Sequence, residues 1–173
     1  MAISFPGLDI TAEICYTILA RHTMGTFFNP TNKLMTRDLT SEIYIDKSLI
    51  IRELNRFVKT ENRFICISRP RRFGKSMASH LISSYYGKNT DSLPLFEKLK
   101  IYQDESFQKH YGKYNVIKLD INGIYRNVEK KVNLVKTLTK KVVVEIMVSF
   151  PSAKVLQKDT LSDAMMKVYA KTG

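Results

Sequence analysis

The chain has 173 residues, of which 44% are hydrophobic and 25% charged, so it is long enough for one globular domain with its own core. This composition excludes a disordered tail, a collagen-like fibre and a disulfide scaffold. The 28 basic residues exceed the 16 acidic ones, and the formal net charge of +12 favours polyanionic partners, either phosphates or nucleic acid. No apolar run approaches the roughly 18 residues of a membrane span. Cys15 and Cys66 lack metal-binding spacing, so we predict a reducing, cytoplasmic location and no membrane partner.

The predicted secondary structure alternates helices with two short apolar strands. Periodic apolar residues predict helices at residues 11–22, 48–59, 75–86, 95–99, 128–149 and 161–170. Strands are predicted at residues 64–67 and 116–119, and residues 25–40, rich in Asn, Thr and Pro, are predicted to form a loop. The first strand is a continuous apolar run, which is typical of a strand buried on both faces. This order predicts an α/β fold with a parallel sheet.

The two C-terminal helices carry further signals. The longer one has an apolar stripe that consists of Val128, Val132, Val135, Leu138, Val142 and Ile146. The shorter one follows Thr160, and Asp163 lies three residues beyond, in the pattern of a capping box. Residues 126–173 hold 10 basic and 4 acidic side chains, a net charge of +6, which indicates either a solvated basic face or a surface for a polyanion.

The clearest motif lies between the first predicted strand and the helix that follows it. The segment reads Ser68-Arg69-Pro70-Arg71-Arg72-Phe73-Gly74-Lys75-Ser76. Its last three residues form the core of a phosphate-binding loop, and the predicted strand before it and helix after it are the context that such a loop requires. Backbone N–H groups at the start of a helix have no intrahelical partner and point toward an approaching anion.

The Gly-Lys-Ser residues have distinct predicted roles. Gly74 lacks the Cβ that would block close approach of a phosphate. Lys75 places an ammonium near the β and γ phosphates, and Ser76 offers its hydroxyl to Mg²⁺. We therefore predict ATP, or a related nucleotide, and Mg²⁺ as ligands.

The rest of the loop departs from the general pattern. Arg69 stands where a second glycine is usual, and Pro70 can pre-form the turn because its ring fixes φ. Arg69, Arg71 and Arg72 add charge that can pair with phosphate, and Phe73 completes the predicted binding segment. The alternative interpretation is a basic surface turn ahead of a helix.

Two longer segments resemble the bacterial AAA-ATPase-like domain family. They are residues 41–48, SEIYIDKS, and residues 63–78, RFICISRPRRFGKSMA. Members of this family typically show a tyrosine–hydrophobic–Asp-Lys segment, a strand, and the same arginine-rich loop ending in Gly-Lys-Ser. The similarity covers roughly residues 24–173, and the arginine-rich loop is its most specific part.

The resemblance implies a partial P-loop NTPase (AAA-like) three-layer fold with a parallel sheet. Residues 24–173 would be the N-terminal part of that domain, and residues 1–23 an N-terminal extension. In the family, the segment like 169–173 is followed by the Walker B strand, so we expect a fold truncated before that strand and without efficient hydrolysis. Larger members also carry a PD-(D/E)XK nuclease-like C-terminal domain.

Asp120 and the pair Asp46 and Lys47 are additional site candidates. Asp120 ends an apolar segment as a Walker B acid does, but the resemblance places it on an earlier strand. Asp46 and Lys47 lie near the nucleotide base by analogy with related ATPases, and a local ion pair is the favoured alternative. Tyr85 and Tyr86 are predicted to be packing residues.

The sequence therefore predicts a module that binds ATP through residues 69–76, and leaves open whether it is an enzyme. The alternative is a basic nucleic-acid-binding module without nucleotide turnover. In that case the loop Arg69–Arg72 and the lysines of residues 130–141 would follow a phosphate backbone. A third interpretation is a fragment without retained activity.

Overall fold

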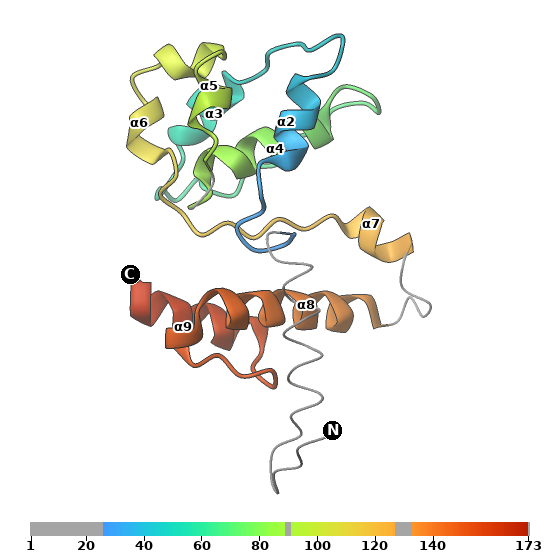
Figure 1. Cartoon of the computed structure of the whole chain (residues 1–173), viewed down its shortest axis with the longest axis vertical. Helices are drawn as coiled ribbons and strands as arrows, with labels where there is room; N and C mark the ends of the chain where they lie inside the picture. Colours follow the sequence, from blue (N-terminus) through green and yellow to red (C-terminus); the bar gives the residue numbers. More distant parts are fainter. Residues whose placement is uncertain (1–25, 89–90, 127–132, 173) are drawn as a thin grey trace, which may run out of the picture. The chain divides into compact units, whose positions relative to one another are not determined.

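A computed structural model describes residues 26–88, 91–126 and 133–172. The chain divides into two compact units, and each is described separately. Unit 1 consists of the described residues 26–28 and 117–172, and unit 2 consists of residues 29–116. Figure 1 shows helices and irregular segments, and the described residues contain no β-strand.

Unit 2 contains six short helices around an aromatic core. They are α2 (Lys33–Leu39), α3 (Ile50–Asn55), α4 (Lys75–Tyr86), α5 (Leu93–Phe96), the 3₁₀ helix η1 (Lys100–Gln103) and α6 (Phe107–His110). The ring of Tyr85 is fully buried and lies against Phe96 and Phe107, with ring centroids 5.8 and 5.3 Å away. Its hydroxyl donates to the carbonyl oxygen of Phe107 at 2.7 Å, so the polar end of this core side chain has a partner.

The two ends of unit 2 lie together. The backbone N–H of Asn29 donates to the carbonyl oxygen of Val116 at 2.8 Å, and the N–H of Val116 donates to Oδ1 of Asn29 at 2.8 Å. The side-chain amide of Asn29 also donates to Oδ1 of Asn115 at 3.1 Å. One asparagine therefore joins both ends of the unit through its backbone and its side chain.

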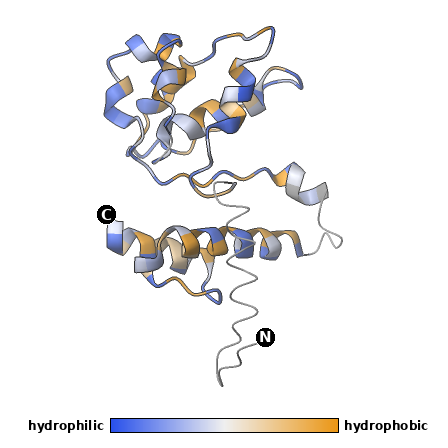
Figure 2. Ribbon diagram, viewed as in Figure 1, coloured by the Kyte–Doolittle hydropathy of each residue, from blue (hydrophilic) through white to orange (hydrophobic). Residues whose placement is uncertain are grey.

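Unit 1 is built on two long helices. Its elements are α7 (Ile121–Arg126), α8 (Leu134–Ser149), the 3₁₀ helix η3 (Pro151–Ala153) and α9 (Leu161–Thr172). Figure 1 shows α8 and α9 side by side, and Figure 2 shows hydrophobic and hydrophilic residues interleaved along α8. Buried residues from both helices form one core, which includes Val142, Ile146, Ala164 and Val168.

A buried acid of α8 holds the segment that enters this core. Oε2 of Glu145 accepts hydrogen bonds from the N–H groups of Phe27 at 2.9 Å and Phe28 at 2.7 Å. Glu145 is only 1% exposed, and its Oε1 has no hydrogen-bond partner. Burial raises the pKa of this carboxyl more than the backbone hydrogen bonds lower it.

The predicted α/β fold is wrong for the described residues, because they form helices and no strand. The same finding contradicts the expected partial P-loop NTPase (AAA-like) three-layer fold with a parallel sheet, truncated before the Walker B strand. Residues 64–67 form no regular secondary structure and are exposed, and the ring of Phe64 is 85% accessible. Around residues 116–119 only isolated bridges form, between Phe28 and Ile117 and between Gly87 and Tyr114. An apolar run becomes a buried strand only where neighbouring strands pair with its backbone, and residues 64–67 find no such neighbour in the part described.

Several predicted helices are present in the described residues. The helix at 75–86 is confirmed as α4, and the one at 161–170 is confirmed as α9. The capping box is also confirmed, because Oδ2 of Asp163 accepts from the hydroxyl of Thr160 at 2.7 Å and Oγ1 of Thr160 accepts from the N–H of Asp163 at 3.2 Å. The helices predicted at 48–59 and 95–99 are present as the shorter α3 and α5.

Other predictions need correction or lie outside the described residues. The loop predicted at 25–40 contains α2, whose Met35 packs into the core of unit 2. In the stripe predicted for 128–149, Leu138, Val142 and Ile146 are buried, but Val135 is 73% exposed. Residues 128–132, the helix predicted at 11–22 and the extension 1–23 lie outside the described residues. Within the described part of the chain, no helix combines the length and apolar character needed to cross a lipid bilayer.

Candidate phosphate-binding site

The predicted loop enters α4 through two residues with left-handed backbone. Arg72 has φ +68° and Gly74 has φ +75°. The first is unusual for a residue with a side chain and costs about 1–2 kcal/mol, whereas glycine adopts this conformation readily. Strain of this kind is concentrated at functional sites in proteins.

The N-terminus of α4 has no side-chain cap. Gly74 occupies the capping position and its carbonyl accepts the first helical hydrogen bond, from Ala78 at 2.9 Å. The N–H groups of Lys75, Ser76 and Met77 precede that first bond and are those that a helix start leaves without an intrahelical partner. They are therefore free to bind a ligand.

The charge around this helix start is the reverse of the usual one. Acidic residues stabilise the first turn of a helix through its dipole, but the first turn of α4 contains none. Lys75 and the loop residues Arg69, Arg71 and Arg72 supply positive charge instead. Within the described residues, none of these four side chains forms an ion pair. An anion would satisfy both the dipole and these cations.

The side chain of Lys75 folds back over the loop. Its Nζ donates to the carbonyl oxygens of Arg69 and of Pro70, the latter at 2.9 Å. An ammonium carries three N–H donors, so one remains available. The lysine thus links two carbonyl oxygens of the loop while keeping a donor for a ligand oxygen.

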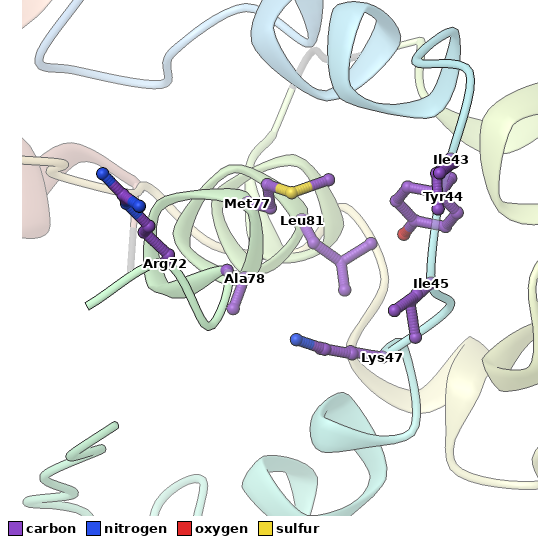
Figure 3. Close-up of a pocket in the computed structure, with 9 residues that line it drawn as sticks. Ile43, Tyr44, Ile45, Lys47, Arg72, Met77, Ala78 and Leu81 are labelled. Carbon is purple, nitrogen blue, oxygen red and sulfur yellow. The ribbon is translucent and has the colours of Figure 1, made fainter. Parts of the chain in front are cut away.

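Lys47 reaches the same loop from a distant part of unit 2. Its Nζ donates to the carbonyl oxygen of Phe73 at 2.9 Å. Figure 3 shows Lys47 extending from the segment 43–47 toward Ala78 of α4. The sequence favoured a local ion pair between Asp46 and Lys47, and the structure has a different arrangement.

Asp46 holds the backbone beside Lys47. Its Oδ1 accepts from the N–H of Ser48 at 2.8 Å, and its Oδ2 accepts from the N–H of Lys100 at 2.9 Å. Burial raises the pKa of Asp46, but these hydrogen bonds outweigh it and the pKa is lowered overall. Asp46 is therefore a charged anchor for the turn that carries Lys47.

Two cavities adjoin the loop and share part of their lining. The larger has a volume of about 540 Å³, which is within the range of small-molecule sites. It is lined by Lys47, Leu49, Ile50, Arg52, Glu53, Ile67, Arg69, Phe73, Gly74, Lys75 and Ala78. The smaller, of about 140 Å³, lies between the segment 43–47 and α4 (Figure 3) and also includes Arg72.

The metal-binding potential of this site is limited to few side chains. Ser76 is exposed in the first turn of α4, as its predicted role requires. Glu53, the acid that lines the larger cavity, is bound by Arg56 at 3.0 Å and Arg52 at 3.2 Å. The hydrogen bonds from Arg56 and Arg52 hold the pKa of Glu53 below its usual value. No group of three potential metal-binding acids, histidines or cysteines occurs among the described residues.

The remaining candidates serve the fold. Asp120 belongs to unit 1, where its Oδ1 accepts from the N–H of Gly123 at 3.0 Å and so caps α7. Tyr85 and Tyr86 are packing residues, as predicted, and the hydroxyl of Tyr86 donates to Oδ1 of Asn55 at 2.7 Å. His80 lies on α4 with its Nδ1 2.6 Å from Oδ2 of Asp38 on α2, so it ties these two helices together.

Glu53, which lines the larger cavity, was not predicted as a site residue, and Lys47 was considered only as a neighbour of the nucleotide base, with a local ion pair as the favoured alternative. Lys47 lies in the segment that carried the family resemblance, and this was the available signal for it. Glu53 had no comparable signal, because an acid on a short helix is ordinary in sequence terms.

A comparison with protein families gives a match to the family described as "Predicted AAA-ATPase", over residues 33–173. The chain belongs to this AAA-ATPase-like family. The match covers well over half of the chain and includes the whole arginine-rich loop, so the predicted resemblance is confirmed. No curated protein and no solved structure matches the chain.

Proposed function

We propose that the chain binds a nucleoside triphosphate, ATP in the first place, through residues 69–76. The observation that carries this proposal is the uncapped start of α4, with left-handed Gly74 and several unpaired cations, on a cavity of about 540 Å³. Membership of the AAA-ATPase-like family supports it at the general level of nucleotide binding.

The residues present fit such a ligand. The N–H groups that begin α4 would bind phosphate oxygens, and the remaining donor of Lys75 would contact the β or γ phosphate. Ser76 would hold Mg²⁺, whose other ligands would be phosphate oxygens and water, as is usual for this ion. Bound Mg²⁺ would neutralise part of the phosphate charge.

We do not propose that the chain hydrolyses ATP efficiently. A phosphoryl-transfer site needs a residue that positions the attacking water as well as cations around the phosphates. Glu53, the acid in the cavity lining, is engaged by two arginines, whose hydrogen bonds lower its pKa and make it a weaker base. We therefore propose binding with little turnover, in the cytoplasmic setting predicted from the sequence.

Nucleic-acid binding is a second candidate with one observation in its favour. Lys136 and Lys140 are exposed on α8 and lie four residues apart, so they share one face of that helix. Lys141 is also exposed, beside Lys140. Such a row can follow a phosphate backbone, and its binding would weaken steeply with salt.

Calorimetry with Mg²⁺ and ATP tests the first proposal. Replacement of Lys75 by Ala should weaken binding about 10- to 100-fold, since a hydrogen bond to a charged group is lost. Lys98→Ala removes an exposed lysine elsewhere in unit 2 and should leave the affinity unchanged. Equal affinities of the wild type and Lys75→Ala would contradict the proposal. A single-stranded oligonucleotide that binds and is lost on replacing Lys136 and Lys140 would favour the second candidate.

A further inference from the structure

Lys47 occupies a position that the phosphate-binding motif does not explain. It lies 26 residues before Phe73 in sequence, yet its Nζ contacts the Phe73 carbonyl at 2.9 Å. The same Nζ lies 3.1 Å from the point where a Cβ on Gly74 would be. The ammonium is therefore placed against the backbone at which α4 begins.

The turn that carries Lys47 is fixed on both sides. Asp46 accepts hydrogen bonds from the N–H groups of Ser48 and Lys100. Ser48 is completely buried, and its Oγ accepts from the N–H of Ile101 at 3.1 Å. Lys47 itself is exposed next to this anchored turn, so the position from which its side chain reaches the loop is set by the fold.

The ammonium of Lys47 is also incompletely satisfied. It donates to one carbonyl and forms no ion pair within the described residues, which leaves two N–H donors. It lines both cavities beside the loop, and Lys75 and Arg69 line the larger one with it. A phosphate oxygen is a stronger partner for an ammonium than a carbonyl, because both groups are then charged.

We infer that Lys47 is a second phosphate-binding lysine, which contacts the phosphate chain together with Lys75 and makes the site select a nucleoside triphosphate over a monophosphate. This inference rests on the proposed function. Two ammonium groups and the guanidinium of Arg69 on one cavity match a ligand with several negative charges. A monophosphate carries less negative charge and a shorter phosphate chain, so it would gain less from a second lysine.

The test compares the affinities of three nucleotides for matched variants of the full chain. Lys47→Met keeps most of the length of the side chain and removes its charge, and Lys98→Met makes the same change at an exposed site elsewhere in unit 2. Calorimetry with ATP, ADP and AMP is combined with thermal unfolding of each ligand-free variant. We expect Lys47→Met to weaken ATP binding about 10- to 100-fold, AMP binding far less, and Lys98→Met to change neither.

The outcomes separate this inference from the proposal beneath it. Binding of ATP by the wild type that Lys75→Ala weakens and Lys47→Met leaves intact overturns the role of Lys47 alone. An equal loss of ATP and AMP affinity in Lys47→Met overturns it too, because it shows that Lys47 only holds the loop. No binding of ATP by the wild type overturns both. Lys47→Arg, which retains the charge, should recover part of the preference for ATP.

Discussion

A Cβ placed on Gly74 would lie 3.1 Å from Nζ of Lys47. The glycine that caps the start of α4 and the lysine that precedes α3 therefore lie so close that a side chain on the glycine would push the ammonium back by a few tenths of an ångström. This contact brings together the Asp-Lys pair and the Gly-Lys-Ser loop. Both segments carry the family resemblance, but the sequence did not show that they touch.

Replacement of Gly74 by Ala should consequently have two effects. The left-handed backbone should cost about 1–2 kcal/mol of stability, and the new methyl group should displace Lys47 and weaken ATP binding. Gly112→Ala is a matched control, because Gly112 also has positive φ, +64°, but has open space around its Cβ position. Denaturant unfolding and calorimetry measure the two effects. Equal losses of ATP affinity in both variants would contradict the role assigned to the contact.

Glu145 should make the stability of unit 1 fall as the pH rises. Burial raises its pKa above the ordinary value of 4.5 in the folded chain, so the unfolded chain loses this proton first. The contribution is fully present below about pH 4.5 and is lost as the pH rises through the raised value. Glu145→Gln removes the titration, so its melting temperature relative to the wild type should increase across that interval. A constant difference between the two proteins would contradict this prediction.

The exposure of residues 64–67 predicts an asymmetry between two phenylalanines. Phe64 is 85% exposed and Phe96 is fully buried. Phe64→Ala should change the free energy of unfolding by less than about 0.5 kcal/mol, whereas Phe96→Ala should cost about 3–5 kcal/mol. Chemical denaturation of the two variants decides the matter. A large loss of stability in Phe64→Ala would contradict this prediction, because it would show that the ring of Phe64 is buried.

The pair between Asp38 and His80 should stabilise the packing of α2 on α4. Both side chains are nearly buried, and Nδ1 and Oδ2 are 2.6 Å apart. A double-mutant cycle with Asp38→Asn and His80→Gln should give a coupling energy of about 0.5–3 kcal/mol. The exposed Arg37 also contacts Asp38, at 3.2 Å, and Arg37→Ala should cost less than about 1 kcal/mol. A coupling energy near zero would show that the two helices are held by apolar contacts alone.

Helical periodicity and the capping box were reliable local signals, whereas the loop composition of residues 25–40 and the apolar strand pattern were not. The helix at 75–86 and the box of Thr160 and Asp163 depend on residues within one helical turn of each other, and both are confirmed. The strand at 64–67 depended on neighbours far along the chain, and apolar composition alone cannot supply them.

The same difference between local and long-range signals applies to the candidate site. The loop 69–76 was predicted because its residues are contiguous and its Gly-Lys-Ser pattern reflects a local mechanism. The position of Lys47 depends on Asp46 accepting from the backbone of Lys100, a contact 54 residues away. No periodicity or spacing encodes such a contact, so only the folded chain reveals it.

The meeting of Asn29 and Val116 has a consequence for the connectivity of unit 2. Because the ends of this unit are already bonded to each other, joining them covalently would add little closure entropy. A circularly permuted version, with a short glycine-serine linker from 116 to 29 and a new opening at the exposed residues 61–62, should keep its helices in register. Native-like helices in this permuted version would show that the packing of unit 2 does not require the native order of its segments along the chain.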